Sequence, residues 1–333
     1  MGSVYLRKVA SLGLASAIAL TATACSPDSA DSQTTGSLTT VSYAYLGAGA
    51  GLVPEVIMAN NPSICEPYGV KPKMQVISQA TAPGALAAGQ IQALRLGGGS
   101  FLIASSKEPA STTIVGGMGP LPLSLFVAKD VKSIADLKDK TVGAPAKGST
   151  SDVAIRELLS QNGLTVGTDV AITYAGSSSA LFGQAASGAI QGFLYSPPVP
   201  EVAGANGVYQ LMSTRGNATL DNLNRTVIAV QRKFLNDNPD AVKGLLACVN
   251  AAAKQIIADP AKAAEVLAKA ASIKLETANG QIEAQIAAGS YNMSAFTADN
   301  ATSVIRALEK FEVAKFDSYD PSTVVNTALL PAS

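Results

Sequence analysis

The sequence contains no histidine and no tryptophan. The absence of histidine excludes a Ser-His-Asp catalytic triad, a His-ligated zinc site and an imidazole general base. The chain also lacks a G-x-S-x-G nucleophile elbow and a knuckle of paired cysteines. Enzyme chemistry would have to use lysine, carboxylate or tyrosine side chains alone. We therefore predict that the protein is not an enzyme and holds no cofactor and no metal.

The chain also lacks an excess of charge of either sign. Its 24 Lys and Arg residues balance 24 Asp and Glu residues, and no basic run occurs. Nucleic acid and anionic membrane surfaces are therefore poor candidates for partners. The part of the chain after the first 40 residues, roughly 290 residues long, exceeds one ordinary hydrophobic core, so we expect two lobes.

The N-terminus has the pattern of an export signal. Arg7 and Lys8 precede an apolar stretch at 9–23, and small residues stand directly before Cys25. The stretch is too short, and too rich in Ala and Gly, for a spanning helix, and no other stretch is long and apolar enough. Small residues before a cysteine resemble a bacterial lipobox, although Ala22 stands where that motif usually has Leu. A plain secretory signal followed by an unrelated cysteine is the alternative.

On the lipobox interpretation, residues 1–24 form a lipoprotein signal peptide and Cys25 carries the lipid. Residues 25–40 are rich in Ser, Thr, Asp and Gly and read as a flexible tether. We then expect the protein on the extracytoplasmic face of the cell membrane. Cys65 and Cys248 would meet oxidising conditions there, so a disulfide between them and two buried free thiols both remain open.

Residues 136–159 are the most informative stretch of the chain. A charged turn leads into a short apolar strand at 141–144, a Gly/Ser/Thr loop and an amphipathic helix. The first N–H groups of such a helix have no partner within it and, beside small hydroxyls, favour a small anionic or polar ligand. Simple capping of the helix by Ser149 or Thr150 explains the pattern equally well.

The same stretch contains a near match to a nucleotide-binding loop. Gly143 and Gly148 have the GxxxxG spacing of a P-loop, but Ser149 stands where that motif requires lysine. The main contact to the β- and γ-phosphates is therefore missing, which argues against nucleotide binding.

Strand-like and helix-like segments alternate along the chain, which predicts an α/β fold. Strands are expected at 41–46, 73–78, 91–96, 141–144, 170–174, 190–195 and 226–231. Helices are expected at 53–59, 81–88, 178–187, 275–288 and 299–313, with two more after Asn238-Pro239 and Asp259-Pro260. The glycine-rich run 97–100 is expected to be the loop that ends a strand.

Two segments about a hundred residues apart look alike. Residues 87–93 and 186–192 each place a glycine, Gly89 or Gly188, where a helix C-cap needs a left-handed residue. In each, an isoleucine then begins a buried strand. The two copies fall at equivalent points of two βαβ successions, which favours two lobes of similar build.

The run 134–143 followed by 148–152 resembles the substrate-binding proteins of bacterial import ABC transporters. The subgroup is the one for nitrate, taurine, aliphatic sulfonates and thiamine-pyrimidine precursors. The helix-glycine-strand copies, the lipobox and the segment 234–246 follow the family's order, and the resemblance covers 41–311. The chain departs from the family at Gln92 and Gln191, which replace usual acidic residues, at the run 195–198 and in its lack of tryptophan.

The resemblance implies a type II periplasmic-binding-protein fold, in which two α/β lobes joined by two crossover strands enclose a ligand cleft. We place the crossovers near 124–128 and 226–231. Lobe 1 would then comprise 41–125 and 228–333, and lobe 2 would comprise 126–227.

Open α/β sheets bind ligands beyond the carboxyl ends of their strands, which selects the loops that would line the cleft. The predicted ligand-binding residues are Tyr45, Gly47, Ala48, Gly49, Gln79, Thr81, Gly99, Ser100, Ser149, Thr150, Ser151, Ser177, Ser178 and Tyr195. Tyr45, Phe101 or Tyr195 would pack on an organic tail of the solute.

The implied function is a lipid-anchored binding protein that delivers a small organic or inorganic anion to an ABC permease and its ATPase, as a monomer. The helix start at Ser149, with Lys147 and Arg95, favours an anion, although both cations are equally explained as solvated surface charges. An uncharged or heteroaromatic solute such as a pyrimidine vitamin precursor is the rival, and Gln92 and Gln191 would suit it. A pyrimidine-processing enzyme and a surface lipoprotein without a ligand are further alternatives.

Overall fold

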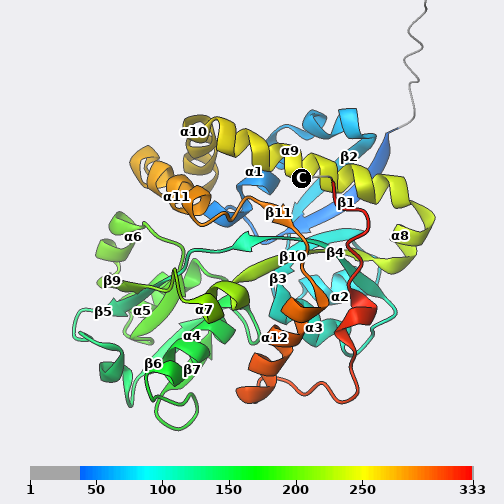
Figure 1. Cartoon of the computed structure of the whole chain (residues 1–333). Helices are drawn as coiled ribbons and strands as arrows, with labels where there is room; N and C mark the ends of the chain where they lie inside the picture. The colour runs from blue at the N-terminus through cyan, green and yellow to red at the C-terminus, as the bar shows by residue number, and fades with distance from the viewer. Residues whose placement is uncertain (1–37, 332–333) are drawn as a thin grey trace, which may run out of the picture. The chain divides into compact units, whose positions relative to one another are not determined.

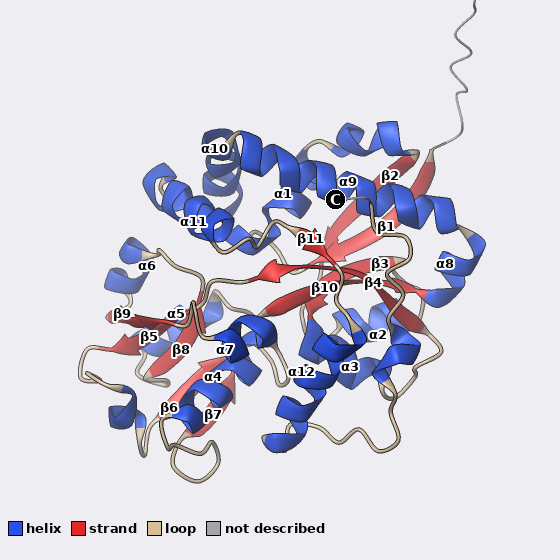
Figure 2. Ribbon diagram, in the orientation of Figure 1, coloured by secondary structure: helices blue, strands red, loops and turns tan. Residues whose placement is uncertain are grey.

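The computed structural model describes residues 38–331, so the predicted signal peptide and Cys25 lie outside the described residues. All described elements belong to one compact unit. Two sheets flanked by helices make up this unit (Figure 1, Figure 2), which confirms the predicted α/β class. The end of the predicted tether is not free, because Thr39 and Thr40 already belong to the first strand.

The first sheet has six strands and the second has five. The strands of the first sheet are β1 (Thr39–Tyr45), β2 (Val70–Val76), β3 (Ala93–Gly97), β4 (Thr112–Pro120), β10 (Arg225–Gln231) and β11 (Met293–Ser294). Those of the second are β5 (Ser124–Ala128), β6 (Thr141–Ala144), β7 (Ala171–Tyr174), β8 (Gly192–Tyr195) and β9 (Val208–Ser213).

The helices cover both faces of each sheet. Those before β5 are α1 (Val53–Asn60), α2 (Ala82–Ala87) and α3 (Gly98–Ser105). Those between β5 and β10 are α4 (Thr150–Gln161), α5 (Ala180–Ala186), α6 (Pro200–Ala205) and α7 (Ala218–Leu223). Those after β10 are α8 (Arg232–Asp237), α9 (Pro239–Ala258), α10 (Pro260–Ala271), α11 (Leu275–Ala287) and α12 (Ala298–Lys310). Short 3-10 segments are η1 (Ala50–Leu52), η2 (Pro62–Tyr68), η3 (Ile134–Leu137) and η4 (Pro321–Val324).

The two sheets have the same order of strands. The first runs β2-β1-β3-β10-β4-β11 and the second β7-β6-β8-β5-β9. In both, the first three strands pair in parallel and the fourth is antiparallel to its neighbours. Strands β1, β3 and β10 of the first sheet therefore correspond to β6, β8 and β5 of the second.

Successive side chains of a strand in the first sheet point to opposite faces, so the strand contributes to two cores. Tyr43 and Ile228 point to the core that α1, α9 and α10 cover, whereas Ala44 and Val227 point to the core under α2, α3 and α12. Figure 2 shows these helices on opposite sides of the strands. The second sheet repeats the arrangement, with α4 and α7 over one face and α5 and α6 over the other.

The chain passes between the sheets just before the two predicted crossover strands. Strand β5 pairs only within the second sheet and β10 only within the first, so residues 121–123 carry the first passage and residues 214–224 the return. The return segment contains α7 and is not a plain extended strand.

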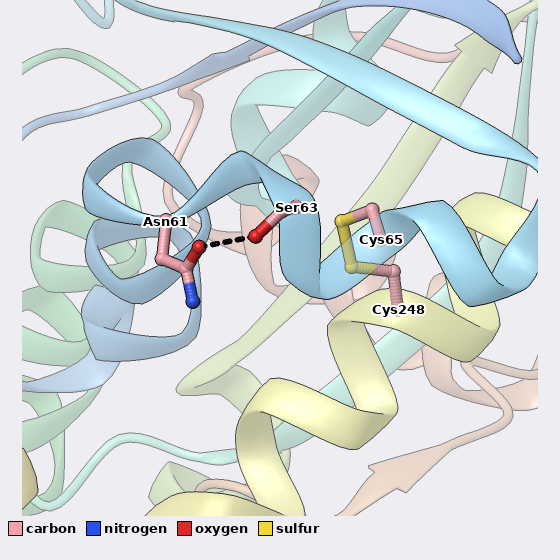
Figure 3. Close-up of a disulfide and its surroundings, with 4 residues drawn as sticks. All are labelled: Asn61, Ser63, Cys65 and Cys248. Atoms are coloured by element: carbon pink, nitrogen blue, oxygen red, sulfur yellow. Dashed lines mark hydrogen bonds between the residues drawn. A yellow bond between two sulfur atoms is a disulfide. The ribbon is translucent and has the colours of Figure 1, made fainter.

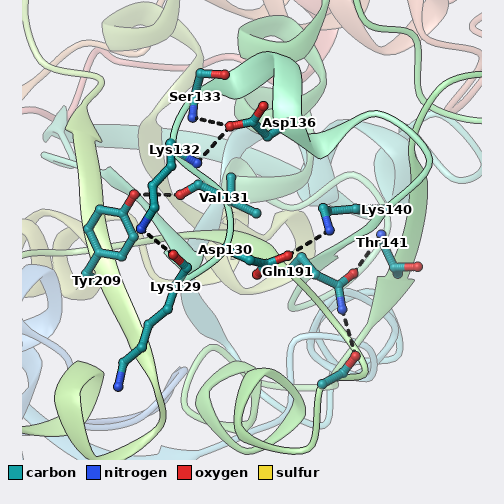
Figure 4. Close-up of polar contacts among 11 residues, drawn as sticks. Lys129, Asp130, Val131, Lys132, Ser133, Asp136, Lys140, Thr141, Gln191 and Tyr209 are labelled. Carbon is teal, nitrogen blue, oxygen red and sulfur yellow. Dashed lines mark hydrogen bonds and ion pairs between the residues drawn. The ribbon is translucent and has the colours of Figure 1, made fainter.

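The duplicated helix-glycine-strand unit has the same hydrogen bonds in both sheets. Gly89 and Gly188 have φ values of 72° and 76°. Gln92 Oε1 accepts a hydrogen bond from Ser42 N at 2.7 Å, and Gln191 Oε1 accepts one from Thr141 N at 3.1 Å (Figure 4). Both side-chain amides therefore hold the adjacent parallel strand, and neither glutamine lines a ligand cavity, contrary to their suggested role in binding an uncharged solute.

Cys65 and Cys248 form a disulfide that joins η2 to α9 (Figure 3). Their Cα atoms are 5.0 Å apart and both residues are fully buried. Close by, the Ser63 hydroxyl and Asn61 Oδ1 are 2.6 Å apart, at the start of the same 3-10 segment. The disulfide links parts of the chain separated by 183 residues.

The sequence predicted a loop for the glycine-rich run after β3, but this prediction is wrong, because the run begins a helix. Gly98, Gly99 and Ser100 form the first turn of α3 and are buried. The run was interpreted as a loop because glycine permits tight turns. Here the lack of a side chain instead allows the helix to begin directly against the backbone of Gly148.

One helix of the described chain, α9, is long and apolar enough to cross a membrane by length and composition. Its apolar residues include Val242, Leu245, Leu246 and Val249, all buried in the core of the first sheet. This is the expected pattern for a core helix.

Candidate functional site

A cavity of about 790 Å³ is lined by loops from both sheets. It lies beyond the carboxyl ends of β1, β2 and β3 on one side and of β6, β7 and β8 on the other. This is where the strand-end rule places a ligand in an open α/β sheet. The site is therefore made by residues far apart in the sequence.

Ten of the predicted ligand-binding residues line this cavity. They are Gly47, Ala48, Gly49, Gln79, Ser149, Thr150, Ser151, Ser177, Ser178 and Tyr195. Four predicted residues do not line it: Tyr45, Thr81, Gly99 and Ser100. Among these, Thr81 is exposed and contacts the Ser78 hydroxyl at 2.8 Å, and the buried Ser100 hydroxyl accepts a hydrogen bond from Gln79 Nε2 at 3.1 Å. Ser100 thus positions a wall residue without being one.

The start of α4 both caps its helix and faces the cavity. Ser149 is the N-cap residue, and its hydroxyl accepts a hydrogen bond from Asp152 N at 3.2 Å. The buried Asp152 carboxylate accepts from Gly148 N at 2.7 Å and from Arg156 Nε at 2.9 Å. These bonds fix the turn and leave the N–H groups at the first two positions of α4 without a partner within residues 38–331.

The starts of α3 and α4 touch through residues without large side chains. A Cβ at Gly97 would lie 2.4 Å from Thr150 Oγ1, and one at Gly99 would lie 2.5 Å from the Gly148 carbonyl oxygen. Gly148 itself has a φ of 74°, which L side chains rarely adopt. Glycine is therefore required where the two helices meet beside the cavity.

An ion pair lies at the β3 side of the cavity. Arg95 Nη1 lies 2.9 Å from Glu55 Oε2, and both side chains have 0% exposure. Arg95 Nε donates to the Thr226 hydroxyl at 3.1 Å, and the Tyr43 hydroxyl donates to Glu55 Oε1 at 3.0 Å. Burial, followed by the Glu55 charge, raises the pKa of Tyr43 well above its ordinary value, so Tyr43 stays a neutral donor.

The suggestion that Arg95 is a solvated surface charge is therefore wrong, whereas Lys147 is exposed and does not line the cavity. Glu55 was not predicted as a site residue, because a single carboxylate early in an expected helix has the pattern of an ordinary helix-start residue. No local signal places it against Arg95, which lies 40 residues away.

The remaining walls are mainly apolar. Tyr195 packs edge-on against Phe182 with ring centroids 4.9 Å apart, and both line the cavity. Burial raises the pKa of Tyr195 above its ordinary value. Phe101, suggested as a packing residue for a tail, is instead 1% exposed in the core under α3. Further apolar wall residues are Leu46, Leu52, Val76, Ile77, Leu121, Leu123, Val199, Val202 and Ile273.

The C-terminal helices also contribute to the cavity, which was not predicted. Ala271 at the end of α10 and the next two residues, Ser272 and Ile273, line the cavity, as does Gln281 of α11. Gln281 Nε2 donates to the Pro198 carbonyl at 3.0 Å and so joins α11 to the loop after β8. These contacts connect segments that no sequence pattern brings together.

The backbone arrangement is similar to that of solved binding proteins. The alkanesulfonate-binding protein SsuA from Xanthomonas axonopodis pv. citri, bound to MOPS, is 17% identical with a TM-score of 0.72, covering 86% of this chain and 98% of its own. The nitrate-binding protein NrtA from Synechocystis PCC 6803 is 15% identical with a TM-score of 0.69, covering 88% and 87%. A Candida albicans protein with the generic periplasmic binding protein fold is 15% identical with a TM-score of 0.67, covering 89% and 99%.

The chain thus has the periplasmic-binding-protein fold, as predicted. Residues 55–272 match the NMT1-like family, and the chain belongs to that family. The predicted relationship to the substrate-binding proteins of ABC import systems is confirmed. A search of the curated proteins gives no match.

Proposed function

We propose that the protein captures a small organic anion of the sulfonate type and delivers it to an ABC import permease and its ATPase. The observation that carries this proposal is the start of α4, where Ser149, Thr150 and Ser151 line the cavity and the first two N–H groups of the helix have no partner among residues 38–331. Helix-start N–H groups favour an anion without a matching cation. The protein binds and releases its solute without chemical turnover.

The cavity supports an organic solute in preference to an inorganic one. Nitrate has four atoms and would leave most of about 790 Å³ unfilled. The apolar walls around Phe182 and Tyr195 offer contacts that only a carbon skeleton can use. The solute in this proposal has a polar head at the helix start and an apolar body.

An uncharged or heteroaromatic solute is the second candidate, and Glu55 favours it. Among the described residues that line the cavity, Arg95 is the only charged one, and the Glu55 carboxylate already compensates it. A solute with neutral acceptor atoms would then bind without adding an uncompensated charge.

We further propose that Cys25 carries a lipid anchor on the extracytoplasmic face and that the protein acts as a monomer. The disulfide between Cys65 and Cys248 supports an oxidising location. The two predicted lobes, 41–125 with 228–333 and 126–227, would close on the solute. Strand membership favours boundaries slightly earlier, at 121–123 and 214–224.

Native mass spectrometry of protein purified from its host tests the proposal, because it identifies a co-purified solute directly. Calorimetry then compares nitrate, alkanesulfonates, arylsulfonates and uncharged pyrimidines. We expect organic sulfonates to bind with micromolar dissociation constants or tighter. Binding of pyrimidines alone would establish the second candidate, and no binding of any small solute would refute both.

Membrane attachment has its own test. Cys25→Ser should release the protein from the membrane fraction, and continued attachment of this variant would contradict lipidation at Cys25.

A further inference from the structure

We propose that Arg95 recognises the polar head of the solute through its free nitrogen Nη2, and that Glu55 sets how strongly the site prefers an anion over a neutral head. The inference rests on the proposed function and names a recognition residue within it. The recognised chemistry is a hydrogen-bond acceptor on an apolar body, either a sulfonate oxygen or the oxygen of a neutral group of the same shape.

The guanidinium of Arg95 is held on two sides and free on the third. Nη1 pairs with Glu55 and Nε donates to Thr226, but Nη2 has no hydrogen-bond partner among residues 38–331. Arg95 is fully buried and nevertheless forms part of the cavity wall, as does Thr226. A buried donor without a partner is rare in native proteins, and a ligand in the adjacent cavity would supply the missing acceptor.

The second sheet provides an internal control for this polar group. Tyr43 pairs with Ala93 in the first sheet, and Val142 pairs with Gly192 at the equivalent place in the second. Arg95 pairs with Ile228 in the first sheet, and Leu194 pairs with Leu125 in the second. In the second sheet the positions of Tyr43 and Arg95 are therefore occupied by Val142 and Leu194, and the position of Thr226 by Leu123, directly before β5. All three are buried and apolar.

The fold consequently does not need charges at these positions. A buried ion pair contributes little net stability, and an apolar replacement of similar volume is often neutral or better. The Glu55–Arg95 pair has no counterpart at the equivalent strand positions of the second sheet, and it lies at the cavity wall, where Arg95 Nη2 has no partner among residues 38–331. This combination points to recognition as the reason for its presence.

Glu55 has a second effect on the solute. Its carboxylate cancels the charge of Arg95, so the guanidinium supplies a directed donor without net positive charge. Replacing Glu55 with an uncharged residue of the same shape would make the site cationic. Affinity for an anion would then rise, whereas affinity for a neutral acceptor of the same shape would change little.

The test uses calorimetry with alkanesulfonates and the matching uncharged sulfonamides. Arg95→Lys keeps the charge beside Glu55 but loses the nitrogen Nη2. We expect its affinity to fall roughly tenfold to a hundredfold for both series, as the loss of a hydrogen bond from a charged group implies. Glu55→Gln should raise the affinity ratio of sulfonate to sulfonamide at least roughly tenfold.

Lys147→Met is the matched control, because it removes an exposed positive charge near the start of α4 that does not line the cavity. Its affinities should match those of the wild type. Thermal unfolding of every variant identifies those that fail to fold, and Thr226→Val, which frees Arg95 Nε, replaces Arg95→Lys if the latter does not fold. Thr226→Val should shift the affinities of both series as well.

The outcomes separate this inference from the proposed function. Folded Arg95→Lys and Glu55→Gln proteins that bind like the wild type would overturn the role of Arg95 and leave the proposed function standing. A wild-type protein that binds neither series, and carries no solute from its host, would overturn both.

Discussion

The two sheets share one order of strands, and in each a glutamine, Gln92 or Gln191, accepts a hydrogen bond from the adjacent parallel strand. The sheets differ in the residues that are buried against them. The first sheet encloses the Glu55–Arg95 ion pair and a disulfide. The second encloses stacked and edge-on aromatic rings, with Phe193 5.9 Å from Phe126 and 5.0 Å from Phe182 between centroids. Features common to both sheets serve the fold, and those present in one are candidates for function.

The largest expected effect comes from giving the first sheet the apolar residue of the second. Arg95→Leu leaves the Glu55 carboxylate buried without its partner and should reduce the free energy of unfolding by about 3–5 kcal/mol. The double variant Glu55→Leu with Arg95→Leu should recover most of this loss, because no charge remains buried. Urea unfolding measures both. A double variant as unstable as the single one would show that the first sheet needs the ion pair.

The disulfide gives the next largest effect, again in the first sheet. Cys65→Ala with Cys248→Ala should lower the free energy of unfolding by about 2–5 kcal/mol. Unfolding of the wild type with and without a reductant provides the control, because the reduced protein should resemble the double variant. An unchanged midpoint in both experiments would mean that the disulfide does not form in solution.

The contact between α3 and α4 predicts a smaller effect. Gly99→Ala places a methyl group against the Gly148 carbonyl and should cost about 1–3 kcal/mol through overpacking. Gly183→Ala in α5 is the matched control, because its Cβ would meet nothing within 4 Å. That variant should gain up to about 1 kcal/mol from helix propensity. Equal melting temperatures for the two variants would contradict the close contact.

The smallest effect concerns acid sensitivity at η3, the 3-10 segment between β5 and β6. Hydrogen bonds from the backbone N–H groups of Lys132 and Ser133 lower the pKa of Asp136 (Figure 4). This contribution is present above the unfolded pKa of about 3.9 and is lost as pH falls through the lower folded pKa. Asp136→Asn should therefore melt slightly below the wild type at neutral pH, and the gap should close below about pH 3. A gap independent of pH would contradict this assignment.

Local chemistry explains what was predicted correctly. Gly89, Gly188 and the start of α4 are set by capping and turn preferences that act within a few residues. The expected residues were chosen because they follow the carboxyl ends of strands, and ten of them line one cavity. By contrast, Gly98 and Gly99 were misassigned, because a glycine run permits a tight turn and a closely packed helix start equally well.

The parts that were not predicted depend on contacts between distant segments. Glu55 and Arg95 meet only because α1 packs in the core that covers one face of the first sheet. The α10–α11 turn reaches the cavity only after β10 has returned the chain to the first sheet. Arg95 carries no mark in the sequence that separates a buried guanidinium from a solvated one.

The disulfide has a consequence for how the protein responds to proteases. The chain from Cys65 to Cys248 forms a closed covalent ring, and this ring contains every strand of the second sheet. A single peptide-bond cut anywhere within the ring leaves one molecule of unchanged mass apart from an added water. The two fragments would separate on a denaturing gel only after a thiol reductant has cleaved the disulfide that still joins them.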